Sequence, residues 1–538
     1  MRVHILRGAL AALLVLGLSL VAFAAEGELA DQQILRYATD ARSLPSLDPI
    51  LGGTNATFPI QNMVFESLIR YQPGNPSLAD IEPALAESWE VSEDGIVWTF
   101  YLRQGVMFHH GYGEFTSEDV VFSFDRARDL EGPSIFASKY AAIETIEAIG
   151  RYEVRFTLNK SDAFFQLTVL NKFAGWLVCK AAVLDLGEEF SNSPVGTGPF
   201  MVDSLIPGEE VILVRNSDYW RGQPTIERVE YYLMPDSTAR TLALLTGEVD
   251  AVRGVVSPEW LAQVEGAGMQ VGYSSPGQMV LFFNLTVKPL DDLRVRQAIA
   301  YALGRERILA FYGGTAIAMP SPVPPFVAGT LTESEIPAEL LYKRDLDHAR
   351  VLLAEAGYAD GLTIETIISE HPDYLKPMQV WQELLKDVGI DLQLTVVDHS
   401  TYHSRIRSEQ IPLIAYGGVR DPIPDVWLYN WYDSRTIIGK PGAITNFSHY
   451  GEVDADGDGT IDSIDALIDT ARGTVVSEEQ IAAWKAAQLQ LLEDLPAFPS
   501  HMVKILFAWQ PYVDLGYDLE GTVVDGIEIW ETTRILKH

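Results

Sequence analysis

The sequence predicts an α/β fold, because strand-like and helix-like patterns alternate along much of the chain. Residues 229–233 have the pattern of a strand, and a helix that Asp236 opens follows them. Residues 280–284 form an apolar strand pattern, and a helix with Val295 and Ile299 on one face comes next. Such alternation is typical of layered α/β domains. The 538 residues are enough for two or three domains.

The composition is that of an acidic globular protein. Lys and Arg number 39 against 74 Asp and Glu, which gives a formal net charge of −35. This negative charge argues against nucleic acids and anionic membrane surfaces as partners. Cys179 is the one cysteine, so no disulfide can form within the chain. Because it lies in an apolar stretch, we expect a buried thiol rather than a nucleophile.

The first residues have the features of a cleavable export signal. Arg2 and Arg7 precede an apolar stretch at residues 8–23. The Ala-Phe-Ala triplet at 22–24 satisfies the small-x-small rule, so we expect the mature chain to begin at Ala25. No cysteine stands directly after the apolar stretch, and no other run is long enough to cross a bilayer. The sequence therefore predicts an exported, periplasmic protein without a lipid anchor.

The most informative stretch predicts a strand hairpin followed by a helix. Apolar and polar residues alternate over 89–91 and 97–101, with a Glu-Asp-Gly turn between them. Thr116 and Asp119 have the spacing of a capping box, and apolar residues recur at helical intervals after them. Further strands are expected at Ile34–Thr39, 145–149, 154–158, Ile390–Val397 and Leu413–Tyr416, and further helices at 345–357 and 378–388.

This stretch closely resembles the signature of the family 5 extracellular solute-binding proteins, the dipeptide, oligopeptide and nickel receptors of bacterial ABC importers. The matching segments are LAESW at 85–89, SEDG at 92–95, WTF at 98–100, LRQGV at 102–106 and SEDVV at 117–121. PVGTGPF at 194–200 is a further hallmark, and its glycines allow a tight backbone path. The chain is therefore identified as a member of this family.

The resemblance implies a two-lobed α/β periplasmic-binding-protein fold of type II, cluster C-like, with an extra subdomain. Its lobes would close over a ligand by hinge motion, and the closed form would dock on a membrane permease. An oligopeptide or dipeptide is the expected ligand of a monomeric receptor, and an oligosaccharide is the nearest alternative. The expected boundaries are the signal peptide at 1–24, lobe 1 at 25–69, the extra subdomain at 70–193, lobe 1 again at 194–285, lobe 2 at 286–505 and the return of lobe 1 at 506–538.

The resemblance places the ligand beside residues 411–432. In peptide-binding members, a strand corresponding to Leu413–Tyr416 pairs with the ligand backbone, and a following aspartate meets its α-ammonium group. That aspartate would be Asp421; if Arg420 takes its place, the cleft favours an anion or an uncharged polar ligand. Trp427 and the aromatic residues after it could stack on sugar rings or belong to the core. The expected ligand-binding residues are Thr54, Asn55, Tyr416, Gly417, Gly418, Arg420, Asp421 and Trp427.

Residues 454–465 match a twelve-residue EF-hand calcium loop. Acidic residues stand at positions 1, 3, 5, 9 and 12, and Gly459 stands at position 6, where the loop turns sharply. The expected ligands of a structural calcium ion are Asp454, Asp456, Asp458, Thr460, Asp462 and Asp465. Aspartate at position 12 resembles the dockerin loop, but a dockerin has two such repeats and this chain has one. An acidic surface loop without metal is the alternative.

The sequence contains no recognisable catalytic constellation. It lacks the G-x-S-x-G elbow, the H-E-x-x-H and C-x-x-C motifs and a Walker A loop. Asp421 and Asp425 could imitate a glycosidase pair, but so acidic a chain produces such pairs by chance. His109 and His110 are adjacent and project apart, so no metal site is expected there. We expect a binding protein and not an enzyme; a secreted hydrolase is the less favoured alternative.

Overall fold

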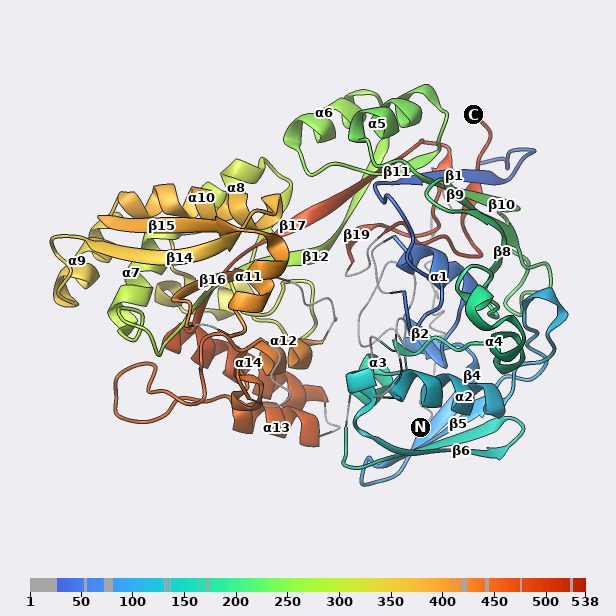
Figure 1. Ribbon diagram of the computed structural model, residues 1–538, viewed down its shortest axis with the longest axis horizontal. Coiled ribbons are helices and arrows are strands. Elements are labelled where there is room, and N and C mark those ends of the chain that lie inside the picture. Colours follow the sequence, from blue (N-terminus) through green and yellow to red (C-terminus); the bar gives the residue numbers. More distant parts are fainter. Residues whose placement is uncertain are drawn as a thin grey trace, which may run out of the picture.

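The computed structural model describes residues 27–52, 56–71, 81–129, 132, 134, 137–162, 164–170, 174–408, 410–417, 423–440, 445–474, 477–522 and 526–538. These residues form two lobes of mixed helices and strands (Figure 1), as the sequence predicts. The expected signal peptide lies outside the described residues. Within the described part, no helix combines the length and the apolar character needed to cross a membrane.

One mixed sheet runs through both lobes. Its main path follows the order β16 (Leu413–Tyr416), β12 (Gln270–Phe283), β17 (Ala497–Trp509), β11 (Ala251–Arg253), β1 (Ile34–Thr39), β10 (Arg228–Leu233), β9 (Glu210–Arg215) and β8 (Phe200–Ile206). Off this path, β13 (Ala316–Ala318) pairs with β17, and β19 (Glu520–Thr522) pairs with β12. β1 is parallel to β10 and β11, whereas β17 is antiparallel to β11 and β12. The first predicted strand, Ile34–Thr39, is therefore an inner strand of this sheet.

Two long strands, β12 and β17, join the lobes. They pair in antiparallel along most of their length, and Figure 1 shows them crossing from one lobe to the other. Their register shifts between Ser274 and Gly277, so the ribbon carries a bulge there. A bulge bends a strand and increases its local twist. The lobes are thus connected through a bent, two-stranded ribbon.

The first lobe packs helices against the β1 end of the sheet. In its core, Tyr37 stacks on Tyr231 with ring centroids 5.0 Å apart. The Asp236 side chain accepts a hydrogen bond from the first turn of α5, and this helix ends at Gly247, whose φ is 75°. The helices of this lobe are α1 (Phe58–Val64), α3 (Phe165–Thr168), α4 (Lys180–Leu186), α5 (Ser237–Thr246) and α6 (Pro258–Gly266).

A second, four-stranded antiparallel sheet carries the family-like signature. Its order is β4 (Ala86–Val91), β5 (Val97–Leu102), β7 (Glu153–Leu158) and β6 (Ile143–Gly150). The predicted hairpin is confirmed as β4 and β5. The predicted capping box is confirmed at the start of α2 (Ser117–Arg128), where Thr116 N–H donates to the Asp119 carboxylate at 3.0 Å. A short pair, β2 (Ile69–Tyr71) and β3 (Ile81–Pro83), precedes this sheet.

The glycines of residues 194–200 allow a close backbone contact, as predicted. A Cβ atom at Gly196 would lie 2.0 Å from the Val64 carbonyl oxygen, and one at Gly198 would lie 2.5 Å from that of Met63. The Gly198 N–H group donates to the Val64 carbonyl at 2.9 Å. Any larger residue would therefore push this segment off the end of α1.

The second lobe surrounds a parallel pair of strands, β14 (Leu362–Ser369) and β15 (Ile390–Val397). Its core contains the fully buried Trp381, Trp427, Trp431 and Trp484. The helices of this lobe are α7 (Leu293–Leu303), α8 (Glu306–Tyr312), α9 (Leu346–Glu355), α10 (Pro372–Lys386), α11 (His399–Arg405), α12 (Pro424–Tyr432), α13 (Asp465–Gly473) and α14 (Ser477–Asp494).

Helix α10 begins at Pro372, earlier than the predicted helix at 378–388. His371 caps it by accepting a hydrogen bond from Asp373 N–H, and Pro372 stands at the first helical position, where proline fits. Pro377 lies inside the helix and removes one backbone donor there. The sequence predicts a helix start only after Pro377, because proline usually ends or interrupts a helix. Here the helix continues through Pro377, so it begins six residues earlier than predicted.

The last segment of the chain returns to the first lobe. β18 (Val513–Asp514) pairs with β20 (Arg534–Ile535) in antiparallel. The Ala30 N–H group donates to the Ile535 carbonyl at 2.9 Å, and Lys537 N–H donates to that of Glu28 at 2.7 Å. The chain therefore enters the second lobe through β12 and returns to the first lobe through β17.

Candidate functional site

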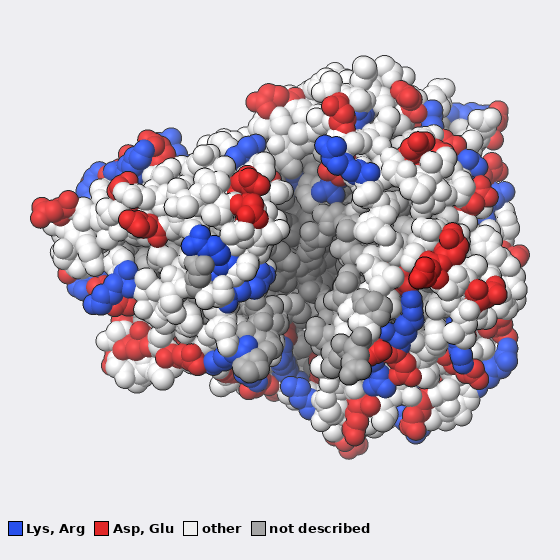
Figure 2. All heavy atoms as spheres, in the orientation of Figure 1, with Lys and Arg blue, Asp and Glu red and all other residues white. Residues whose placement is uncertain are grey.

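A hollow between the two lobes is the candidate ligand cleft. Figure 2 shows this hollow on the face in view. Tyr416, Gly417 and Trp427 are described and belong to the second lobe. The other predicted ligand-binding residues lie outside the described residues; they are Thr54, Asn55, Gly418, Arg420 and Asp421.

Strand β16 brings Tyr416 and Gly417 to the edge of the main sheet. Tyr416 is half-buried and pairs with Val280 of β12. A Cβ atom at Gly417 would lie 1.9 Å from the carbonyl oxygen of Gln278, so the two strands can approach here only because this residue is glycine. The group that approaches Gly417 closely is thus the neighbouring strand of the protein itself.

Two carbonyl groups of β16 already have side-chain donors. Thr366 Oγ1 donates to the Leu413 carbonyl at 2.6 Å, and Tyr402 Oη donates to that of Ala415 at 2.7 Å. Among the described strands, none pairs with the outer edge of β16. Side chains of the second lobe therefore occupy the Leu413 and Ala415 carbonyls of β16.

Trp427 and the aromatic residues after it belong to the core of the second lobe. Trp427 and Trp431 are 1% and 0% exposed, and their rings pack edge to face with centroids 5.4 Å apart. Tyr432 is buried beside them. Of the two alternatives for Trp427, the structure therefore shows the core position. Because α12 turns these rings away from solvent, Trp427 does not reach a ligand in this conformation.

Asp425, the second member of the conceivable acid pair, has a structural partner. Its buried carboxylate accepts hydrogen bonds from Arg472 at 2.9 and 2.8 Å. Burial raises the pKa of Asp425, and Arg472 opposes that shift. A carboxylate held in this way anchors α12 to α13.

A cluster of imidazole and phenol rings beside β16 escaped the sequence analysis. We call it the His-Tyr cluster and define it as His371, Tyr374, His399, His403 and Tyr416. Ring centroids are 4.5 Å apart for His399 and His403, 5.1 Å for His371 and His399, and 5.8 Å for His403 and Tyr416. The sequence does contain a signal for it, because His399 and His403 are spaced to share one face of a helix.

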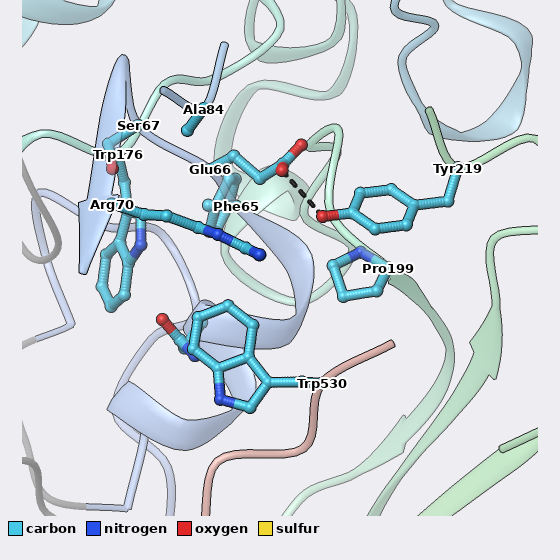
Figure 3. Close-up of a pocket in the computed structure, with 10 residues that line it drawn as sticks. Phe65, Glu66, Ser67, Arg70, Ala84, Trp176, Pro199, Tyr219 and Trp530 are labelled. Atoms are coloured by element: carbon cyan, nitrogen blue, oxygen red, sulfur yellow. Dashed lines mark hydrogen bonds between the residues drawn. The ribbon is translucent and has the colours of Figure 1, made fainter. Parts of the chain in front are cut away.

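A small cavity lies beside Glu66 in the first lobe (Figure 3). Its volume is about 20 Å³, which is enough for a single water molecule and too small for a peptide. The Glu66 carboxylate accepts hydrogen bonds from Thr197 Oγ1 (2.8 Å), Tyr219 Oη (2.9 Å) and Trp220 Nε1 (3.0 Å). Burial raises the pKa of Glu66. This is a structural polar network and not a solute site.

The predicted calcium loop brings three carboxylates together. Ligand oxygen atoms of Asp454, Asp456 and Asp462 lie within 4.8 Å of one another. The Asp454 carboxylate also accepts hydrogen bonds from Gly457 N–H at 2.7 Å and Gly459 N–H at 2.8 Å. Gly459 has a φ of 97°, which suits glycine at the sharp turn of the loop. These oxygen ligands fit a hard cation such as calcium.

The remaining predicted calcium ligands lie outside that trio. Asp458 accepts hydrogen bonds from the Thr460 N–H at 2.8 Å and hydroxyl at 2.6 Å. Asp465 is directed at Ser434, whose N–H and hydroxyl groups donate to it at 2.9 and 2.5 Å. Position 12 of an EF-hand is a glutamate, and aspartate is one methylene shorter. Asp465 here is the first residue of α13, and its carboxylate joins the start of this helix to Ser434.

Cys179 is buried, as the sequence predicts, and His109 is buried in a hydrogen-bonded position. His109 Nε2 contacts the Gly198 carbonyl at 2.9 Å, and Gly196 N–H donates to Nδ1 at 3.3 Å. Burial lowers the pKa of His109 to about 4. The Cys179 thiol is buried, and burial raises its pKa. Neither group is an exposed ligand or nucleophile.

The chain is similar in sequence to bacterial solute-binding proteins. The family model described as "bacterial extracellular solute-binding proteins, family 5 middle" matches residues 80–440. Heme-binding protein A of Haemophilus influenzae is 28% identical over 526 residues, which cover 89% of each chain. The dipeptide-binding protein of Escherichia coli is 26% identical over 522 residues, which cover 90% of this chain and 92% of that protein.

Solved structures share the fold over nearly the whole chain. MoaA from A. tumefaciens R10, in complex with mannopinic acid, has a TM-score of 0.76 and 32% identity, covering 94% of this chain and 100% of that one. DppA from Helicobacter pylori, in complex with the peptide STSA, has a TM-score of 0.73 and 28% identity, covering 94% and 98%. HbpA2 from Haemophilus parasuis, with a TM-score of 0.81, 24% identity and coverage of 93% and 99%, shows the same fold.

Proposed function

The chain belongs to the bacterial extracellular solute-binding proteins of family 5, and from this premise we propose that it captures an oligopeptide or dipeptide between its lobes and delivers it to an ABC permease. The carrying observation is the position of β16, which is an edge strand of the sheet that spans both lobes. We propose that an extended peptide pairs with backbone beyond Tyr416 and that Asp421, which lies outside the described residues, supplies the carboxylate for its ammonium group. The peptide complex of H. pylori DppA supports this ligand class.

Ligand-driven closure follows from the connection between the lobes. The ribbon of β12 and β17, with its bulge near Ser274, is the element that must bend. A ligand favours the closed form only if it binds that form more tightly than the open one, so it must contact both lobes. We propose Thr54 and Asn55 as contacts from the first lobe, and Tyr416, Gly417 and the residues after them as contacts from the second.

The first test is native mass spectrometry of the purified protein, followed by identification of the released molecules. We expect the released molecules to be peptides. We also expect these peptides to stay unchanged when they are incubated with the protein again, because the proposed protein is a receptor and not an enzyme. Turnover of a peptide or glycoside would favour the secreted hydrolase. Release of sugars alone would replace peptides by an oligosaccharide as the ligand.

A substitution at Asp421 tests the charge partner of the peptide. Asp421→Asn is expected to weaken binding of free-amine dipeptides at least tenfold, with little effect on N-acetylated ones, because only the ammonium group loses its partner. Isothermal titration calorimetry measures both affinities, and Asp391→Asn, at an exposed position of the same lobe, is the control. Equal losses of affinity for both peptide forms would mean that Asp421 does not bind the ammonium group. Arg420 would then face the ligand, and the cleft would favour an anionic ligand.

A sugar-derived acid is the second candidate ligand. The observation that favours it is MoaA in complex with mannopinic acid, which is 32% identical to this chain, against 28% for the peptide-bound DppA. Binding of mannopinic acid that exceeds the affinity for every dipeptide tested would favour this candidate. Arg420 would then stand where peptide receptors have their carboxylate.

We also propose that residues 1–24 direct export to the periplasm, where the mature chain acts as a monomer. The basic start, the apolar stretch and the Ala-Phe-Ala triplet support cleavage before Ala25. Intact mass measurement of protein recovered from the periplasm is expected to give the mass of a chain that begins at Ala25. A retained N-terminus would overturn the export proposal.

A structural calcium ion in the loop at 454–465 is a separate proposal. It is supported by the EF-hand spacing and by the approach of Asp454, Asp456 and Asp462 to one another. The loop touches the core, because the buried Arg296 donates to the Ala455 carbonyl. The ion would therefore stabilise the contact between this loop and α7 rather than act in signalling.

Chelation tests this calcium proposal. EDTA is expected to lower the melting temperature of the wild type by several degrees and to have little effect on an Asp454→Ala, Asp458→Ala double variant, because a ligand that binds only the folded state stabilises it. Differential scanning calorimetry with and without added calcium makes the measurement. An Asp360→Ala variant, at an exposed site outside the loop, serves as control. Equal responses of the double variant and the wild type would contradict the proposal of a calcium ion in this loop.

A further inference from the structure

Two side chains of the first lobe lie in the apolar core of the second. Phe164 and Leu167 follow β7 of the four-stranded sheet, yet they belong to the cluster that contains Trp381, Trp427 and Trp484. Phe164 is 3% exposed and Leu167 is 8% exposed. The Phe164 ring lies against the Trp484 ring of α14, with centroids 5.2 Å apart and an interplanar angle of 32°. We call Phe164, Leu167 and Trp484 the interlobe clasp.

The short helix α3 has two apolar faces, which pack on different lobes. Phe165 is buried in the core of the first lobe, where its ring centroid lies 5.7 Å from that of Trp98 and 5.5 Å from that of Phe156. Phe164 and Leu167 are three residues apart, a spacing that places side chains on one face of a helical turn. The first lobe therefore fixes α3 through Phe165, while the opposite face contacts the second lobe.

Packing within the second lobe fixes the position of Trp484. A Cβ atom at Gly329 would lie 2.8 Å from Cε3 of this tryptophan, so the ring rests directly on that loop. Gln488, one turn later in α14, donates to the carbonyl oxygen of Trp484 at 3.0 Å and to that of Gly329 at 2.9 Å. The Trp484 side chain is buried. Phe164 thus meets a ring that its own lobe already holds in place.

Charged groups act on one another across the same junction. Asp162 accepts a hydrogen bond from the Phe164 N–H group at 2.9 Å, so it stands at the start of α3. In the second lobe, burial lowers the pKa of Arg472, but Asp425, Tyr429 and Asp162 outweigh burial and raise it. Burial raises the pKa of Asp425, Arg472 opposes that rise, and Asp162 adds to it. Because Asp162 attracts one partner and repels the other, we assign the stability of the junction to the apolar contact.

The interlobe clasp lies away from the ribbon that joins the lobes. Figure 1 shows β12 and β17 crossing between the lobes in the upper half of the view, and α3 facing α12 and α14 in the lower half. When two lobes rotate about a hinge, the points farthest from the hinge separate most. Opening about the ribbon therefore parts Phe164 from Trp484 and exposes both rings to water.

We propose that the interlobe clasp stabilises the closed form before a solute binds, and that it thereby sets the affinity for every solute alike. Burial of one aromatic ring against another contributes free energy that is lost when the lobes open. A solute that binds only the closed form has its full affinity only if that form is already populated. The effect on affinity rests on the proposed capture of a solute, whereas the effect on closure does not.

Small-angle X-ray scattering of protein from which bound solutes have been dialysed tests the clasp. Phe164→Ala and Leu167→Ala remove the contact from the side of the first lobe and leave Phe165 in place. Both variants are expected to have a larger radius of gyration than the wild type, because their lobes open. Leu184→Ala, at a residue of the same lobe that is 69% exposed, is expected to scatter like the wild type.

Far-UV circular dichroism identifies a variant that has failed to fold, and the other variant then decides. Folded Phe164→Ala and Leu167→Ala proteins that scatter like the wild type overturn the inference. Phe164→Leu keeps an apolar side chain and is expected to restore most of the closure.

Calorimetric titration with Ala-Ala and with Ala-Ala-Ala gives a second readout. Phe164→Ala is expected to weaken the binding of both peptides by the same factor, about tenfold, because both lose the same closed population. A loss for one peptide alone would mean that Phe164 contacts the ligand, and it would overturn the common effect on affinity. A wild type that binds neither peptide counts against the proposed function, and the scattering result still decides the clasp.

Discussion

The two lobes bury arginine side chains in different chemical surroundings. In the first lobe, Arg70 pairs with the carboxylates of Glu82 at 2.5 Å and Glu531 at 3.1 Å. In the second lobe, Arg296 is 0% exposed and donates to four backbone carbonyls. The acceptors are those of Leu290 (2.8 Å), Asp494 (2.8 Å), Leu495 (3.1 Å) and Ala455. Carboxylates neutralise the charge of Arg70, whereas the dipoles of backbone carbonyls stabilise the charge of Arg296.

The difference shows how each lobe uses its buried cation. Burial lowers the pKa of Arg296 to about 10, because carbonyl dipoles replace water only in part. Burial also acts on Arg70, but Glu531 and Glu82 outweigh it and raise its pKa. Arg70 lines the small cavity beside Glu66. Arg296 instead joins α7, the end of α14 and the loop at 454–465, which are far apart in the sequence.

Replacing Arg296 should have the largest effect on stability. Arg296→Met leaves four buried carbonyls without their donor, and breaking such a site costs about 3–5 kcal/mol. Urea unfolding monitored by tryptophan fluorescence measures the free energy. Arg294→Met, two residues earlier on the solvent side, should change the unfolding midpoint little. A small effect at Arg296 would mean that water replaces the guanidinium and that the carbonyls do not depend on it.

Replacing Glu66 should have an intermediate effect that depends on pH. Glu66→Gln turns an amide group toward donors that a carboxylate accepts, at a cost of about 1–3 kcal/mol. The folded pKa of Glu66 lies above its ordinary value of about 4.5. The folded state therefore holds the proton to higher pH than the unfolded state, and this contribution to stability is lost as pH rises from 4.5 through the folded pKa.

Urea unfolding at several pH values from 4 to 8 measures that slope. The wild type is expected to lose stability from this group over the stated window, and Glu66→Gln is expected to lack that component. Glu365→Gln, at an exposed position, should keep the wild-type slope. Identical slopes for the Glu66 variant and the wild type would show that this carboxylate titrates equally in both states.

Removing a surface ion pair should have the smallest effect. Lys386 and Glu383 form a pair at 2.7 Å in which both side chains are mostly exposed. Solvent and salt screen such pairs, so Lys386→Met should leave the urea midpoint within experimental error. A clear loss would contradict the view that burial, rather than charge pairing as such, decides the effects at Arg296 and Glu66.

Local patterns predicted much of the fold. The strand at Ile34–Thr39 and the capping box of Thr116 depend on neighbouring residues, and the structure confirms them. Three of the four carbonyls that hold Arg296 belong to residues about 160–200 positions away, so helical periodicity alone could not predict its role. Its burial follows from tertiary packing that no local pattern contains.

The candidate site was less predictable than the fold. Trp427 was open to two interpretations, because an aromatic residue near a cleft and one in a core have the same local pattern; the packing on Trp431 decides it. The His-Tyr cluster joins α10, α11 and β16, so only the spacing of His399 and His403 was visible beforehand. The roles of Arg420 and Asp421 stay predictions.

The return of the chain through β17 also has a mechanical consequence. Both ends of the described chain are attached to the first lobe, where Leu29 bridges Leu536. A force that pulls the termini apart acts first on this bridge and on the contacts of β1 and β20. The chain connects the second lobe to the first only through β12 and β17, so the force does not act on it directly. It would therefore remain folded while the first lobe yields, and a single-molecule extension trace should show two lengths released in that order.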